Sequence, residues 1–150
     1  MSEMLGNQYF MARKYLLAES ELAACLEEYP HSKSIKRKLI VCYAQNGNLN
    51  KALELFSSLI NQDIEFIINA DPIIDDCPCE EIIDELEKHR EHNYSAAEYD
   101  LFLGIVWLFC NAKTSLKYLR KAAKTLHNNK FLNSSINCLE EYYNSNAQSV

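Results

Sequence analysis

Apolar and polar positions along this chain alternate with the period of an α-helix. In the first sixty or so residues the pattern predicts four helices, each with one apolar and one polar face. They are expected over about residues 3–11, 14–29, 32–45 and 48–61. Pro30 ends the second helix, because proline cannot continue a helical hydrogen-bond ladder. Gly47 suits the left-handed position that follows the end of the third helix.

The middle of the chain breaks this pattern, and the remainder resumes it. Asp71 and Cys77 each precede a proline, which disfavours helix at those positions, so an irregular stretch with one helix near 78–91 is expected there. Ser95 and Glu98 then have the spacing of a capping box and start a helix that is apolar nearly all round. Two more helices are expected near 113–126 and 130–143, the last with one apolar stripe.

The first helical hairpin recurs 34 residues further along the chain. Large positions stay large and the small position stays small. The matched pairs are Leu5 and Leu39, Gly6 and Ile40, Tyr9 and Tyr43, Tyr15 and Leu49, Ala18 and Ala52, Leu22 and Phe56, Cys25 and Leu59, and Pro30 and Ile64. A later match consists of Leu103, Gly104 and Trp107, followed by Ser115, Leu119 and Ala122 if the turn is one residue shorter. A period of this length indicates stacked helical hairpins.

These residues resemble the tetratricopeptide repeat (TPR) family, whose pattern runs Leu-Gly, Tyr, Gly, a large residue, Ala, an aromatic residue and Pro. The first repeat departs from it at Arg13, where the turn glycine usually stands. The resemblance implies an all-α fold of TPR-like helical hairpins in a right-handed solenoid of about seven helices. We expect one domain over residues 1–150. Its parts are repeats at about 1–32 and 33–66, an irregular acidic insert at 67–93, a late repeat at 94–127 and a C-terminal capping helix at 128–143.

The resemblance also implies a function: a non-catalytic adaptor or co-chaperone that holds a peptide or helix of a partner protein in a concave groove. In the family, the first helix of each repeat lines that groove. Carried over by position, the groove residues are Glu3, Asn7, Phe10, Arg37, Val41, Ala44, Leu101, Ile105 and Leu108. The subgroup that clamps chaperone carboxylates is disfavoured, because Glu3 and Glu98 stand where it needs lysine and would repel a carboxylate.

The amino-acid composition and net charge argue against several classes of function. Three glycines and no glycine-rich phosphate loop or nucleophile elbow argue against an enzyme. A net charge of −6 argues against a nucleic-acid partner. No apolar run is long enough to cross a membrane and no secretory signal is visible, so we expect a cytoplasmic protein without a membrane partner. The six cysteines are expected to be free thiols, several of them on buried helix faces.

Charge is unevenly distributed along the chain. Eleven acidic residues and no lysine or arginine lie between Ala52 and Glu87, whereas six basic residues and no acid lie between Leu101 and Leu139. Three interpretations stay open: two solvated helix faces, an acidic patch that steers a basic partner, or self-association of the acidic middle with the basic end. A homo-oligomeric scaffold, in which a second copy occupies the groove or the apolar late helix, is an alternative to the adaptor.

A further alternative is a zinc-binding protein. Cys77, Cys79, His89 and His92 offer two thiolates and two imidazoles, which are ligands that zinc prefers. The two histidines share one helix face because they are three residues apart. The Cys-x-Cys spacing is tighter than the usual gap in zinc sites, so a proline turn beside two exposed histidines explains the same residues without metal. Apart from this alternative, no cofactor is expected.

Overall fold

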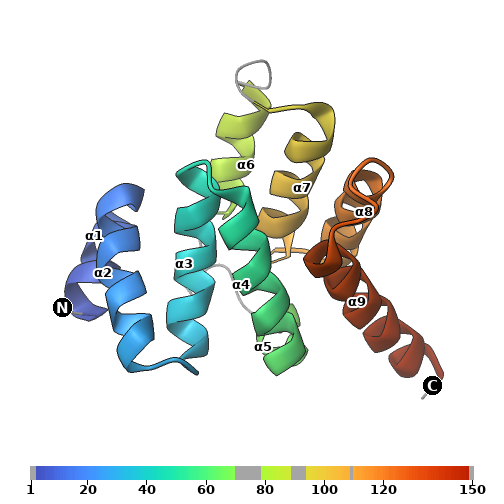
Figure 1. The fold of residues 1–150 in the computed structure, drawn as a ribbon, viewed down its shortest axis with the longest axis horizontal. Coiled ribbons are helices and arrows are strands. Elements are labelled where there is room, and N and C mark those ends of the chain that lie inside the picture. Colours follow the sequence, from blue (N-terminus) through green and yellow to red (C-terminus); the bar gives the residue numbers. More distant parts are fainter. Residues whose placement is uncertain (1–2, 70–78, 89–93, 109, 149–150) are drawn as a thin grey trace. The chain divides into compact units, whose positions relative to one another are not determined.

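The computed structural model describes residues 3–69, 79–88, 94–108 and 110–148, except for the side chains of residues 79, 86–88 and 146–148. Within this part of the chain there are nine α-helices and no strand (Figure 1). The all-α, helical-repeat class expected from the sequence is confirmed. Contacts between residues gather in two compact units, Met1–Leu59 and Ile60–Val150. The expected repeat and insert boundaries stay predictions, because this division does not test them.

The first unit holds α1 (Glu3–Met11), α2 (Tyr15–Glu28), α3 (Lys33–Gln45) and most of α4 (Leu49–Gln62). These bounds lie within one or two residues of those expected from the sequence. α1 packs against α2, and α2 packs against α3. Gly6 makes the first contact close, because a Cβ atom there would lie only 2.8 Å from Cδ2 of Leu22. Leu22 is fully buried, so it has little room to move aside.

The turns of the two repeats have the same hydrogen bonds. Lys14 donates its backbone N–H to the carbonyl of Tyr9 at 2.9 Å, and Asn48 donates to Tyr43 at 2.8 Å. The residue before each donor is left-handed, with φ of 62° at Arg13 and 85° at Gly47. Gly47 therefore occupies the position predicted for it, and Arg13 adopts the conformation of the glycine that it replaces, which is strained for a residue with a Cβ atom.

The second unit contains the end of α4 and five further helices: α5 (Ile64–Ile68), α6 (Cys79–Lys88), α7 (Ala96–Trp107), α8 (Ala112–Ala123) and α9 (Lys130–Gln148). α7 packs against both α6 and α8, and α9 packs against α8 and α5. The short α5 was not expected from the sequence. It begins where Asp63 accepts a hydrogen bond from the backbone N–H of Phe66 at 3.3 Å, which is a helix N-cap.

The late hairpin, α7 and α8, repeats the packing of the first one. A Cβ atom at Gly104 would lie 2.6 Å from Cδ2 of Leu119. The predicted capping box is present, since Ser95 and Glu98 exchange hydrogen bonds of 3.2 and 3.3 Å. Asn111 donates its N–H to the carbonyl of Trp107, four residues earlier rather than five. The turn is therefore one residue shorter than in the first two repeats, as the sequence match required.

Candidate partner-binding site

Seven of the nine predicted groove residues are buried in the structure. They are Phe10, Arg37, Val41, Ala44, Leu101, Ile105 and Leu108. Arg37 is 9 % exposed, and each of the other six is 3 % exposed or less. Glu3 is exposed and Asn7 is partly exposed. The groove stays a prediction, and it requires a partner to uncover apolar side chains that are covered here.

The accessible part of the predicted groove is polar. Lys38 of α3 donates from Nζ to Oδ1 of Asn7 in α1 at 2.9 Å, and both side chains are partly exposed. This hydrogen bond ties the first helices of the two repeats together. Glu3 lies on the same helix as Asn7, one turn before it. A partner at this surface would meet hydrogen-bonding and charged groups rather than an apolar pocket.

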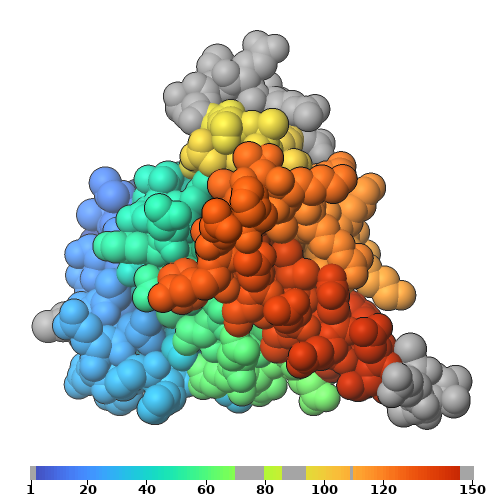
Figure 2. Space-filling view, turned by 45° about the vertical axis from the view of Figure 1, so that its right-hand side comes forward, coloured from blue at the N-terminus to red at the C-terminus, as the bar shows by residue number. Residues whose placement is uncertain are grey.

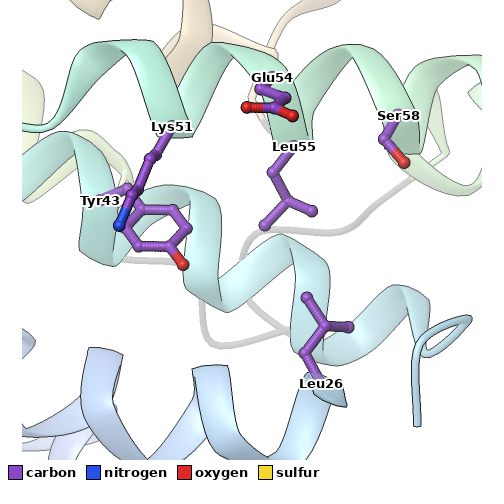
Figure 3. A pocket seen from close by; sticks show the side chains of 6 residues that line it. All are labelled: Leu26, Tyr43, Lys51, Glu54, Leu55 and Ser58. Carbon is purple, nitrogen blue, oxygen red and sulfur yellow. The ribbon is translucent and has the colours of Figure 1, made fainter.

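A hollow that the sequence did not predict lies in the same unit, where α2, α3 and α4 meet. Its volume is about 340 Å³, at the small end of the range for ligand pockets. Its lining residues are Leu26, Tyr43, Lys51, Glu54, Leu55 and Ser58 (Figure 3). Leu26 from α2 and Leu55 from α4 point toward each other across it. Both leucines are only partly exposed, so they form an apolar floor that is open to solvent.

Polar groups surround this floor. The Nζ of Lys51 lies 5.7 Å from the ring centroid of Tyr43, close enough for a cation–π contact. Burial raises the pKa of Tyr43, and the negative charges of nearby carboxylates act in the same direction, so its phenol stays neutral and remains a hydrogen-bond donor. Lys36 donates from Nζ to Oγ of Ser58 at 3.4 Å, which orients that hydroxyl. Glu54 supplies an exposed carboxylate.

The cysteine thiols of the described residues are poor candidates for chemistry. Cys25, Cys42, Cys110 and Cys138 are free. Burial raises the pKa of Cys42 to about 12, and burial together with the charge of Glu80 raises the pKa of Cys110 to about 11. Since the thiolate is the reactive form and the metal ligand, these two side chains stay protonated and unreactive near neutral pH.

The predicted zinc ligands fall outside the part of the chain that the structure describes. Cys77, His89 and His92 lie in segments between the described ranges, and the side chain of Cys79 is also excluded. Among the described residues, no three histidine, cysteine, aspartate or glutamate side chains lie close enough together to hold a metal ion. Zinc binding by these four residues therefore stays a prediction.

Comparison with protein families finds one match, which lies mostly in the first unit. Residues 9–63 match the family model of the tetratricopeptide repeat. This segment is therefore similar to the tetratricopeptide repeat family. It covers the last three residues of α1 and all of α2, α3 and α4, and so includes every residue that lines the hollow. TPRs commonly mediate protein–protein interactions and are typically non-catalytic. No curated protein and no solved structure matches the chain.

One structural finding bears on the membrane prediction: within the described residues, no helix combines the length and the apolar character needed to cross a bilayer.

The sequence contains one signal for the hollow. Leu26 and Leu55 are apolar residues beside buried repeat positions, next to Cys25 and Phe56 respectively. The TPR pattern does not require a large apolar residue at either place. An apolar side chain that the repeat does not use for its own packing indicates a surface available to something else. Periodicity alone does not show whether a neighbouring helix covers such a side chain.

Proposed function

We propose that this protein is a non-catalytic adaptor of the cytoplasm that holds a segment of a partner protein at the hollow formed by α2, α3 and α4. The observation that carries the proposal is the open apolar floor of Leu26 and Leu55 inside the TPR segment. Burial of apolar surface supplies the driving force for such contacts. The hollow replaces the predicted first-helix groove as the contact surface, since most groove residues are buried.

The residues that line the hollow indicate which kind of partner segment it holds. The apolar floor fits a large apolar side chain of the partner. Lys51 and Glu54 stand one helical turn apart on α4 and carry opposite charges, so one attracts an acidic group and the other a basic group. The mixture suits an amphipathic helix, in which apolar side chains alternate with polar ones at the spacing of a helical turn. Charge at the rim would affect orientation and association rate more than affinity.

The proposal can be tested with a library of displayed peptides drawn from natural protein sequences. The wild-type chain is used to select binders, and each binder is then measured against a Leu55→Glu variant. Leu55 is partly exposed, so the new carboxylate is expected to leave the helix folded while it places a charge on the apolar floor. Selected peptides should bind the variant about tenfold more weakly or worse, because a charge there must be desolvated.

The matched control is Leu17→Glu, which makes the same change on α2 at a leucine that is 49 % exposed and outside the hollow. Binding should survive this substitution. If peptides bind Leu17→Glu and Leu55→Glu equally well, the hollow is not the contact surface. Loss of binding in an Asn7→Arg variant instead would place the contact on the first-helix surface that the sequence predicted. Failure to select any peptide would contradict the adaptor function itself.

A further inference from the structure

Two helices of the second unit carry exposed faces of opposite charge. Every exposed residue of α8 is basic: Lys113, Lys117, Arg120 and Lys121. Lys124, directly after the helix, is exposed as well. In α6, every exposed residue whose side chain the structure describes is acidic: Glu80, Glu81, Asp84 and Glu85. Exposed helix faces usually mix both signs, as i,i+4 pairs of opposite charge stabilise a helix.

Each of these faces is unfavourable when it is alone. Lys113, Lys117 and Lys121 follow one another at intervals of four residues, and like charges at that spacing destabilise a helix. Glu80 and Asp84 have the same relation on α6. An oppositely charged surface packed against either face would remove this repulsion.

The helix dipole accounts for only part of the pattern. Acidic residues in the first turn of α6 and basic residues in the last turn of α8 are favourable at those ends. However, Lys113 stands in the first turn of α8, where the dipole disfavours a positive charge. Glu85 stands in the second half of α6, where the dipole gives a negative charge no support. These residues need another explanation.

Contacts within the chain satisfy some of the basic groups. Arg120 forms an ion pair with Glu140 of α9 at 3.0 Å. The Nζ atoms of Lys113 and Lys121 lie over the rings of Tyr143 and Tyr118, at 5.9 and 5.3 Å. These aromatic rings leave the positive charge uncompensated. The space-filling view shows the region of α8, in orange, as an open surface (Figure 2).

The acidic and basic faces cannot pair within one unit. α7 contacts α6 on one side and α8 on the other, and lies between them (Figure 1). The two faces are therefore available to neighbouring molecules and complementary in charge. We propose that the protein self-associates, with the acidic face of α6 in one copy docked on the basic face of α8 in a second copy. This contact is independent of the hollow in the first unit.

The proposed contact between α6 and α8 depends on the attraction of opposite charges, so added salt and charge-reversing substitutions both test it. Sedimentation equilibrium of the full chain should show association at an ionic strength of about 0.01 M and its loss at about 1 M, because the screening length falls from about 30 Å to about 3 Å. A Lys117→Glu/Lys121→Glu variant and an Asp84→Lys/Glu85→Lys variant should each associate about tenfold more weakly than the wild type at low salt.

The decisive experiment mixes the two variants. In the first variant, the exposed face of α8 has two basic and two acidic residues, so it no longer attracts the acidic α6 of another copy. In the second variant, the exposed face of α6 likewise has two residues of each sign and no longer attracts the basic α8 of another copy. In the mixture, the unchanged acidic α6 of the first variant meets the unchanged basic α8 of the second. Association should therefore return to within a few-fold of the wild type.

A Glu27→Lys/Glu28→Lys variant is the control for the Asp84→Lys/Glu85→Lys variant, because it makes the same change in net charge at two exposed residues of α2. It should associate as the wild type does. A wild-type chain that stays monomeric at low salt overturns the proposal. So does association that is unaffected by either reversal, or a mixture of the two variants that remains dissociated.

Discussion

The first hairpin, α1 and α2, and the late hairpin, α7 and α8, bring their helices together in the same way but connect them differently. In both, a glycine of the first helix lies against a buried leucine of the second: Gly6 against Leu22, and Gly104 against Leu119. The first turn has a left-handed residue at Arg13, whereas the late turn is one residue shorter. The comparison shows that the close contact between the two helices is the same in both hairpins, whereas the turn that joins them can differ in length and conformation.

The strongest test of this comparison is to add one methyl group at each glycine. In Gly104→Ala the new Cβ would meet Leu119 at 2.6 Å on its side chain and 3.2 Å on its backbone nitrogen. A backbone atom cannot move aside alone, so we expect a loss of about 3 kcal/mol in the free energy of unfolding. In Gly6→Ala the two nearest atoms belong to the side chain of Leu22, and the loss should be about 1 kcal/mol, since alanine also favours the helix.

Urea unfolding followed by circular dichroism measures both losses. Leu103→Ala, at the fully buried residue beside Gly104, serves as a reference for an ordinary core loss in the same helix. Equal losses in the two glycine variants would mean that the backbone contact in the late hairpin is unimportant. No loss in either variant would contradict the close approach itself.

A smaller effect is expected from a buried hydroxyl group in the late hairpin. Ser115 is fully buried, and its hydroxyl donates a hydrogen bond to the carbonyl of Gly104. The equivalent residues in the first two repeats are Ala18 and Ala52, also fully buried. Ser115→Ala should lower the unfolding free energy by about 1 kcal/mol, the usual contribution of such a bond. An increase in stability would show that the hydroxyl serves something other than packing.

The smallest changes in stability are expected from substitutions in the turns of the first two repeats. Gly47→Ala should destabilise the first unit by about 1 kcal/mol, because a Cβ atom is unfavourable at φ of 85°. Arg13→Gly should relieve the same strain at φ of 62°, but it also removes the hydrogen bond from the guanidinium to the carbonyl of Phe10 at 3.4 Å. The net gain should be a few tenths of a kcal/mol. Thermal unfolding of both variants checks the opposite signs, and equal signs would contradict the shared left-handed turn.

Local signals in the sequence predicted the helices well. The residues Ser95 and Glu98 form the capping box that the sequence predicted. Ser32 caps α3 and Asn111 caps α8 in a similar way, by accepting hydrogen bonds from the backbone. Such caps depend on residues three positions apart, so the sequence contains all the information they need. The shorter late turn was also predictable, because the spacing between Trp107 and Ser115 differs by one residue from that between Tyr9 and Ala18.

Exposure was much harder to predict than helix position. Ile105 and Val41 occupy the helix positions that the family pattern assigns to the groove, yet both are buried. Helical periodicity gives the direction of a side chain, but whether another segment covers it depends on contacts distant in sequence. The hollow was missed for the same reason, since Leu26, Tyr43 and Leu55 belong to three helices and meet only in the folded unit.

The shortened turn of the late hairpin has a consequence for how related chains should be aligned. The spacing from Trp107 to Ser115 is one residue shorter than that from Tyr9 to Ala18. The second helix is therefore out of phase with any fixed-length repeat, although Gly104 still lies against Leu119. Insertions and deletions at such loop tips are tolerated because few buried contacts depend on them. Related chains are therefore expected to vary in length at this turn and to retain a small residue at position 104. An alignment of homologues should therefore match the residues that form the contact between positions 104 and 119, and should not assume a fixed repeat length.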